Sequence, residues 1–344
     1  MQAGGLVPIL SLGHLGHLTG ASYRYLRDIV ERTRDPYLDI TRPKKSGGTR
    51  AISSPEPVLM DVQRWLLRNV FNRVEPHPSS HAYCRNRSIR TCASEHVGAR
   101  WLMKFDLHDF FDMVTEREAY GQLRRLGYPE LISLEIARVC TRLSVDPANY
   151  QGRHNRYTVI KTYSMRRTGV LPQGGPTSGA IANGAAHTLD RKLTAFAAER
   201  SLVYTRYSDD LVFSSSDRFD RSVATKYVSH VGNLVGDHGF LLHRKKTRVI
   251  PPGARHIVLG LLLGPDDVRL LPEFKRRIEQ HVRGVSRFGL REHAAHRSFR
   301  SVIGFVNHVD GCLAFAAGIE PAFAAKLRDA WDSSLAGAGY VVSS

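Results

Sequence analysis

The chain has 344 residues, 42% of them apolar, and no low-complexity tract, which excludes a disordered or fibrous protein and predicts two or three folded subdomains. An excess of 49 Lys and Arg over 32 Asp and Glu gives a net charge of +17, which favours a polyanionic partner, nucleic acid before anionic membrane. Because the sequence has no run of 18 or more apolar residues, no basic secretory leader and no Cys-x-x-Cys pair, we expect a cytoplasmic protein without a membrane span or zinc site.

The N-terminal part alternates between helical and extended patterns. Residues 22–33 repeat apolar side chains at helical spacing and predict a helix. Residues 37–55 alternate in polarity and contain a Gly-Gly turn at 47–48, which predicts a β-hairpin with a basic tip. Residues 58–74 then predict an amphipathic helix.

The next elements are a strand and two helices. Residues 100–111 predict a buried strand that ends in an acidic and aromatic turn. Thr115 and Glu118 have the spacing of a capping box, which predicts the start of a helix. The Gly- and Pro-rich sequence LPQGGPTSG leads into a long helix, with Thr177 or Ser178 as its expected N-cap.

The C-terminal part predicts a second strand system and then a helical region. Residues 205–215 form a strand, a turn with two adjacent aspartates and another strand. A helix is expected over about 217–238, a basic hairpin over 239–250 and a short apolar strand over 256–264. From Pro272 onward the pattern is helical and basic.

Carboxylates follow two of the predicted apolar strands. Asp106 ends one strand, and Asp209 and Asp210 lie in the turn after another. If these strands are neighbours, the carboxylates converge and can bind hard divalent cations such as Mg²⁺. Two such ions roughly 3.5–4 Å apart stabilise an in-line phosphoryl displacement. A solvated turn is the alternative for Asp209 and Asp210, because aspartate favours turns.

Five motifs in this order resemble the motif series of reverse transcriptases: FDLHDFF, LPQGGPTSG, RYSDDLVFS, GFLLHRKKTRV and HIVLGLLLG. From about residue 43 to the C-terminal helices the chain is similar, more narrowly, to the bacterial retron type. The resemblance implies an α+β right-hand polymerase. Residues 1–271 would hold interleaved fingers and an antiparallel palm sheet, and residues 272–344 a helical thumb.

The resemblance also implies catalytic roles. Asp106 and Asp209 would be the principal ligands of two Mg²⁺ ions, and Asp210 would complete the set. Lys246, or its neighbour Lys245, would protonate the pyrophosphate leaving group, with plain surface charge as the alternative.

A nucleotide-binding set is implied in the same way. Arg50 would hold the incoming triphosphate with help from Lys44 or Lys45, the alternative being a solvated basic hairpin. Phe111 would be an aromatic gate that excludes a 2′-OH, with core packing as the alternative. Gln173 and Gly174 would lie against the nucleotide and template, the alternative being a turn that only starts the following helix.

The chain departs from the family pattern at four places. Ser208 stands where the catalytic turn usually has alanine, and Gly179 stands where the LPQGG loop usually ends in proline. Residues 92–96 and 258–260 replace the Asn-Ala-x-x-His and Val-Thr-Gly signatures of retron enzymes.

The implied function is RNA-directed DNA synthesis from dNTPs. The enzyme would copy part of a cognate noncoding RNA into single-stranded DNA (msDNA), primed from a guanosine 2′-OH, in anti-phage defence with a separate effector or toxin protein. The alternatives are a defence-associated reverse transcriptase with different priming, an RNA-dependent RNA polymerase, and a catalytically silent RNA-binding scaffold for a toxin.

Overall fold

The computed structural model describes residues 5–43, 49–143, 168–217 and 220–340. By its internal contacts the chain divides into two compact units, Met1–Ser88 with Met103–Val249 and Ile89–Leu102 with Ile250–Ser344.

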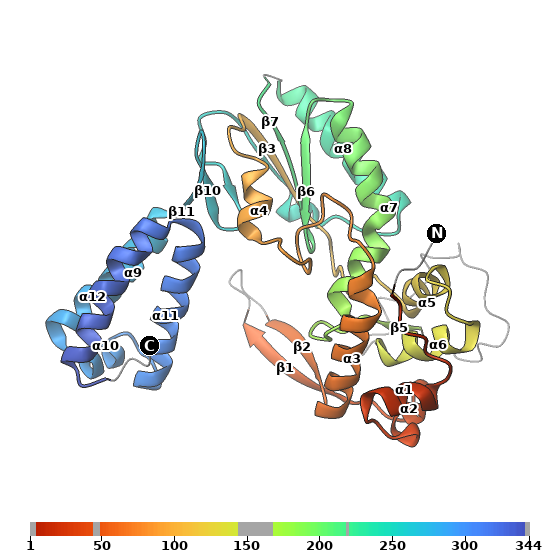
Figure 1. The fold of residues 1–344 in the computed structure, drawn as a ribbon. Helices are drawn as coiled ribbons and strands as arrows, with labels where there is room; N and C mark the ends of the chain where they lie inside the picture. The colour runs from red at the N-terminus through yellow and green to blue at the C-terminus, as the bar shows by residue number, and fades with distance from the viewer. Residues whose placement is uncertain (1–4, 44–48, 144–167, 218–219, 341–344) are drawn as a thin grey trace. The chain divides into compact units, whose positions relative to one another are not determined.

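The first unit contains most of the helices and strands (Figure 1). In chain order they are α1 (Leu12–Thr19), α2 (Tyr23–Val30), β1 (Tyr37–Pro43), β2 (Thr49–Pro55), α3 (Pro57–Asn69), η1 (Phe71–Arg73), β3 (Trp101–Asp106), α5 (Glu116–Arg125), α6 (Glu130–Val139), β4 (Arg142–Leu143), β5 (Gly169–Val170), α7 (Ser178–Ala198), β6 (Val203–Tyr207), β7 (Asp210–Ser215), α8 (Arg221–Asp237), η3 (Arg244–Lys246) and β8 (Arg248–Ile250).

The centre of this unit is a four-stranded sheet in the order β6-β7-β3-β8. Strands β6 and β7 pair antiparallel from Val203↔Ser214 to Tyr207↔Asp210. Helices α7 and α8 lie side by side along one face of the sheet (Figure 1). Phe105 of β3 and Phe213 of β7 meet edge to face with ring centroids 5.7 Å apart. This packing explains why β3 and β7 are apolar runs in the sequence.

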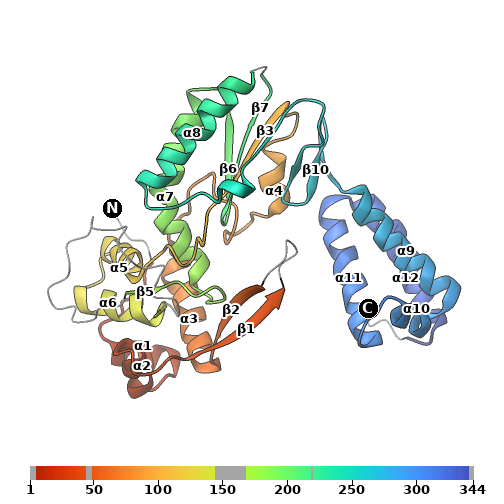
Figure 2. The ribbon, with the colours of Figure 1, turned by 180° about the vertical axis from the view of Figure 1, so that it is seen from behind.

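The predicted N-terminal hairpin is confirmed. Strands β1 and β2 pair antiparallel from Tyr37↔Pro55 to Pro43↔Thr49, and the Gly-Gly turn lies outside the described residues. Seen from behind, the hairpin lies beside α3 (Figure 2). The predicted capping box is also confirmed, since the Thr115 side chain accepts from the backbone of α5 and Glu118 bonds back to the Thr115 N–H.

Two local predictions are wrong, and a third is confirmed only in part. Residues 239–250 form no hairpin, because β8 joins the central sheet beside β3 instead. Residues 256–264 are not one strand but a tight hairpin, whose turn residues Leu259 and Gly260 have φ of +49° and +81°. Positive φ at both central residues is the geometry of a type I′ turn, although Leu-Gly lacks its usual sequence signal. The N-cap prediction is confirmed in position only: Thr177 is the N-cap residue of α7, but its side chain makes no cap hydrogen bond, and the Ser178 hydroxyl donates to the Pro172 carbonyl.

The second unit combines a small sheet with a helical bundle. Its elements are α4 (Ile89–Ser94), β9 (Ile257–Val258), β10 (Leu261–Leu263), β11 (Val268–Leu270), α9 (Pro272–Phe288), α10 (Leu290–His296), α11 (Val302–Ile319) and α12 (Pro321–Gly337). The helical region predicted from Pro272 is confirmed, with that proline in the first turn of α9. Phe305 and Trp331, both fully buried, pack in the bundle with ring centroids 5.9 Å apart.

Helix α11 is, among the described residues, the one helix long and apolar enough to cross a membrane by length and composition. Polar residues interrupt it, which is why the sequence has no uninterrupted apolar run here. One of them, Asp310, accepts hydrogen bonds from Trp331 Nε1 at 3.0 Å and Arg328 Nη1 at 2.6 Å. Helix α11 packs against α9 and α12 in this unit, and one such helix is weak evidence for a membrane span.

Candidate active site

Three aspartates meet at one edge of the central sheet. Asp106 is the last residue of β3, Asp209 lies in the turn between β6 and β7, and Asp210 is the first residue of β7. Strands β7 and β3 are neighbours, and the Leu107 N–H donates to the Asp209 carbonyl at 2.8 Å. The expectation that the two strands lie side by side is therefore confirmed.

The turn that carries Asp209 has two residues and is tightly held. The Tyr207↔Asp210 pair closes it, and Ser208 adopts a left-handed φ of +59°. A short polar side chain tolerates this conformation better than a bulky or β-branched one. The small residue at position 208 thus fits the turn that presents the carboxylates.

A buried ion pair supports the turn from inside the unit. The Arg206 and Asp190 side chains are both fully buried, and their Nη2 and Oδ2 atoms are 2.6 Å apart. Arg206 Nη1 also donates to the Ser208 carbonyl at 3.1 Å, which ties the pair to the turn. The sequence reasoning missed these residues. The available signal was an arginine inside the apolar strand VYTRY and an aspartate in the middle of a long helix.

Burial and mutual repulsion raise the pKa values of two of the carboxyl groups. Burial, followed by the charges of Asp209 and Asp106, raises the pKa of Asp210 to about 6. Burial and the Asp106 charge also raise the pKa of Asp209, against the opposing effect of Lys246 and nearby hydrogen-bond donors. The neighbouring carboxylates therefore disfavour the ionisation of Asp210 and Asp209, which is the electrostatic condition that a cation relieves.

The two candidate lysines differ in what they contact. Lys246 Nζ lies 2.8 Å from Asp106 Oδ2, with the lysine half-exposed. Lys245 is exposed, and its carbonyl accepts a hydrogen bond from Arg248. Of the two, Lys246 is thus the one placed at the aspartates.

The donor set suits Mg²⁺ held jointly with phosphates. Among the residues that the structure describes, no group of three or more His, Cys, Asp or Glu side chains is arranged to hold a metal ion alone. Mg²⁺ usually binds through one or two carboxylates and completes its shell with water and substrate phosphates. The oxygen-only donors of Asp106 and Asp209 fit that mode and do not form a closed protein cage.

The predicted nucleotide-binding residues lie on different elements of the first unit. Phe111 is partly buried and packs against Phe110, with ring centroids 5.7 Å apart. Phe110 is buried in the core. Arg50 belongs to β2 and pairs with Arg42 across the hairpin, whereas Lys45 and Lys44 lie outside the described residues.

The LPQGG loop is attached to the hairpin. The Gln173 carbonyl accepts from the Ser53 N–H at 2.8 Å. Gly174 has a φ of +128°, and a Cβ there would lie 2.7 Å from the Ser53 carbonyl oxygen. Glycine is required at this position both by its backbone conformation and by the close approach of β2.

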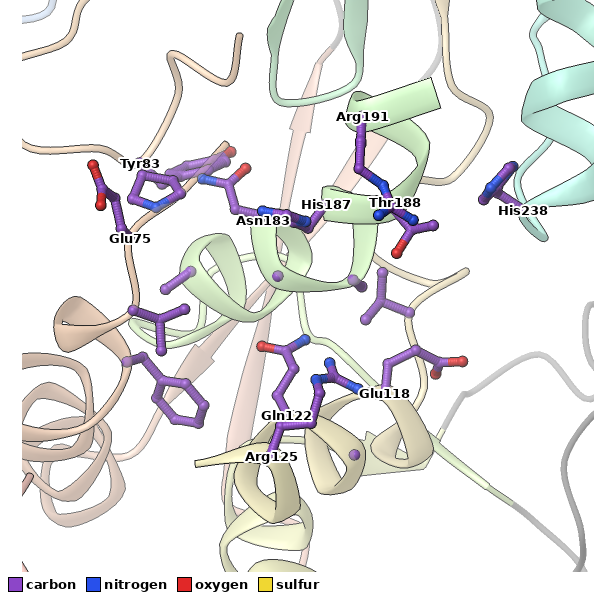
Figure 3. Close-up of a pocket in the computed structure, with 18 of the residues that line it drawn as sticks. Glu75, Tyr83, Glu118, Gln122, Arg125, Asn183, His187, Thr188, Arg191 and His238 are labelled. Carbon is purple, nitrogen blue, oxygen red and sulfur yellow. The ribbon is translucent and has the colours of Figure 1, made fainter. Parts of the chain in front are cut away.

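A cavity of about 1290 Å³ lies between α5, α7, the chain around η1 and the residues after α8. Figure 3 shows Gln122 and Arg125 of α5 facing Asn183 and His187 of α7 across it. None of the three aspartates lines the cavity. Its lining is rich in arginine: Arg73, Arg85, Arg87, Arg117, Arg125 and Arg191.

Comparisons with known proteins give one family. Residues 42–264 match the family described as reverse transcriptase (RNA-dependent DNA polymerase). The retron Mx162 reverse transcriptase of Myxococcus xanthus is 35% identical over 273 residues, which are 76% of this chain and 55% of the relative. The retron Mx65 reverse transcriptase of the same organism is 32% identical over 301 residues, 86% of this chain and 64% of the relative. This chain therefore spans less than two thirds of the length of either.

A third relative matches over most of both chains. The retron Ec86 reverse transcriptase of Escherichia coli is 26% identical over 318 residues, 92% of this chain and 87% of the relative. Among solved structures, telomerase from Candida albicans in complex with a fragment of telomeric RNA aligns with 90% of this chain and 65% of its own at 10% identity. Its TM-score of 0.44 is too low to bear on function.

Proposed function

The chain belongs to the reverse transcriptase (RNA-dependent DNA polymerase) family and is of the retron type, and we propose that it copies part of a cognate structured noncoding RNA into single-stranded DNA. The fold is the right-hand polymerase fold of that family. The observation that carries the proposal is the meeting of Asp106 with Asp209 and Asp210 at one sheet edge, inside the segment that matches the family.

The reaction is attack of a 3′-OH, or of a 2′-OH in the priming step, on the α-phosphate of a dNTP. The new P–O bond forms as the bond to pyrophosphate breaks. Asp106 and Asp209 would hold two Mg²⁺ ions, which supply charge neutralisation at the attacking and leaving oxygens. Asp210 would complete the carboxylate set, and Lys246, whose Nζ lies beside Asp106, would give a proton to the leaving pyrophosphate.

The remaining assignments position the nucleotide. Arg50, assisted by Lys45, binds the triphosphate, and Phe111 lies under the sugar and excludes a 2′-OH. Gln173 and Gly174 lie against the nucleotide and template, and the attachment of their loop to β2 supports a rigid wall there.

The finer features rest on similarity to retron enzymes. We assign residues 1–271 to fingers and palm and residues 272–344 to the thumb. Priming from a guanosine 2′-OH, a branched RNA–DNA product (msDNA), a cytoplasmic location and a role in anti-phage defence with an effector protein belong to the same proposal. In the second unit α4, which carries part of the altered 92–96 signature, packs against β10 and β11, next to the altered 258–260 signature.

Charge supports RNA as the partner. The net charge of +17 and the arginine-rich cavity both favour phosphate contacts. Because each neutralised phosphate releases counterions, RNA affinity is expected to fall steeply as salt concentration rises.

The test is to purify the protein after expression with its flanking DNA and to sequence the nucleic acid that accompanies it. The active-site variant is Asp209→Asn with Asp210→Asn. The matched control is Asp266→Asn with Asp267→Asn, a second adjacent pair that is exposed and lies between β10 and β11.

We expect DNA joined to one RNA through a bond that a debranching enzyme cleaves, present with the wild type and the control and absent with the active-site variant. DNA without that branch would retain the polymerase and refute the priming mode. Incorporation of NTPs in place of dNTPs would indicate an RNA polymerase. RNA alone with every protein, together with no dNTP incorporation in vitro, would refute the proposed function and favour an RNA-binding scaffold.

A further inference from the structure

We propose that Tyr83 is a second aromatic residue of the sugar pocket, which holds Phe111 in position and thereby sets the discrimination between dNTPs and NTPs. The inference rests on the proposed function, because it needs Phe111 to face the sugar. Tyr83 belongs to none of the five sequence motifs, and the structure alone brings it to them.

The conformation of Tyr83 is unusual for a large aromatic residue. Its φ is +58°, in the left-handed region, and 54% of its surface is exposed. Left-handed backbone at a bulky non-glycine residue is a rare state that surrounding contacts must maintain, and such residues concentrate at functional sites. Because the Tyr83 side chain is more than half exposed, burial in the core does not account for this backbone conformation.

Tyr83 contacts two of the motifs that build the candidate active site. Its ring meets that of Phe111 edge to face, with centroids 6.0 Å apart and an angle of 67° between the planes. Its hydroxyl shares a hydrogen bond of 3.1 Å with Ser208 Oγ, in the residue directly before Asp209. One side chain therefore joins the proposed sugar gate to the turn that carries the catalytic carboxylates.

The third contact explains a departure from the family pattern. Gly179, in the first turn of α7, stands where the family usually has proline. A Cβ on Gly179 would lie 2.3 Å from Tyr83 Cγ and 2.6 Å from its Cδ1, which is far inside van der Waals contact. The Tyr83 ring thus fills the space that a side chain at 179 would occupy, which accounts for a glycine in this helix although glycine is a poor helix former.

These contacts give Tyr83 a positioning effect on Phe111. Among the described residues, Phe111 makes ring contacts with Tyr83 and with Phe110. Edge-to-face packing restricts the orientation of a partly buried ring. Without the Tyr83 ring, Phe111 gains rotational freedom, and a gate that moves excludes a 2′-OH less well.

The experiment measures kcat/KM for dGTP and for GTP on one RNA template with a DNA primer. Tyr83→Ala is expected to lower the dGTP:GTP ratio by about tenfold or more, since loss of a packing contact in a pocket has effects of that size. Tyr83→Phe keeps the ring and is expected to keep the ratio within about threefold of wild type, with any loss confined to kcat. Tyr23→Ala is the matched control, because Tyr23 on α2 is a tyrosine of similar exposure, 51%.

Gly179→Ala tests the same contact from the other side. Its Cβ must displace the Tyr83 ring, so the ratio is expected to fall as it does in Tyr83→Ala. Adding Gly179→Ala to Tyr83→Ala is expected to cause no further fall, because the ring is already absent. If Tyr83→Ala cannot be purified folded, Tyr83→Leu replaces it under the same criterion.

The outcomes separate the two proposals. A wild-type protein that incorporates no dNTP contradicts the proposed function. An active wild type whose dGTP:GTP ratio is unchanged in Tyr83→Ala, or whose ratio falls equally in Tyr23→Ala, overturns the role of Tyr83 and leaves the polymerase intact. A Gly179→Ala effect that simply adds to that of Tyr83→Ala also overturns it, because the two residues would then act independently.

Discussion

Replacing Arg206 by methionine is expected to destabilise the first unit more than a surface arginine change can. The guanidinium is fully buried and donates to Asp190 Oδ1 at 2.8 Å and Oδ2 at 2.6 Å. It also donates to Asn183 Oδ1 at 3.0 Å, and to the Ser208 carbonyl and Ser80 Oγ at 3.1 Å each. Burial opposes its charge, yet the adjacent Asp190 raises the pKa of Arg206 above its ordinary value.

The magnitude follows from what the substitution leaves behind. Arg206→Met would strand the Asp190 carboxylate in the interior without its cation, and breaking a buried pair in this way costs about 3–5 kcal/mol. Replacing both partners, with Asp190→Leu added, removes the stranded charge. An apolar pair of similar volume is often close to neutral, so the double variant should be more stable than Arg206→Met alone.

Equilibrium urea unfolding of the wild type, both single variants and the double variant measures this coupling. The control is Arg34→Met, whose partner Glu56 is 2.8 Å away but whose pair is 46% and 39% exposed. That control should lose far less stability than Arg206→Met, because exposed ion pairs contribute little. A loss below about 1 kcal/mol in Arg206→Met, or a double variant whose loss equals the sum of the two single losses, would refute the reasoning.

Three further outcomes are expected. Because burial and the two neighbouring aspartates raise the pKa of Asp210 from 3.8 to about 6, the folded state binds this proton more tightly than the unfolded state, and stability is lost as the pH rises from 3.8 to about 6. In EDTA, Asp210→Asn should therefore raise the free energy of unfolding by on the order of 1–3 kcal/mol at pH 7 and by little at pH 4 in urea titrations, and equal gains at both pH values would contradict this. Gly174→Ala forces a Cβ against the Ser53 carbonyl at a positive φ, so dNTP incorporation should drop by about tenfold or more while circular dichroism still reports a folded chain; full activity would disprove a rigid loop. Lys246→Gln should lower kcat by about 10²–10⁴-fold with KM for dNTP little changed, whereas Lys245→Gln should not, and equal effects would refute the assignment of the proton donor.

Much of the fold and of the carboxylate set could be predicted from local sequence signals. The β1–β2 hairpin, the capping box of α5 and the start of α9 at Pro272 each depend on residues within one turn or strand of each other. The apolar runs that end at Asp106 and begin after Asp210 indicate central strands, and neighbouring central strands bring their ends together.

What sequence alone left undecided depends on contacts between distant segments. Strand β8 pairs with β3, and not within a local hairpin, because the open edge of the central sheet offers it hydrogen-bond partners. The choice of Lys246 over Lys245 follows from which side of the η3 turn faces Asp106. Neither choice has a local signal, since both depend on where another element already lies.

The same holds for the residues that support the site. Nothing in the local sequence around Arg206 shows that Asp190 of α7 pairs with it in the folded chain. Nor does the loop sequence around Tyr83 show that its ring packs against Gly179. The sequence by itself determined which carboxylates are candidates for metal binding, because apolar strands and the residues at their ends can be recognised from the local pattern. The tertiary structure decided what holds those carboxylates and the neighbouring aromatic rings in place, because burial and ion pairing are properties of residues brought together by folding.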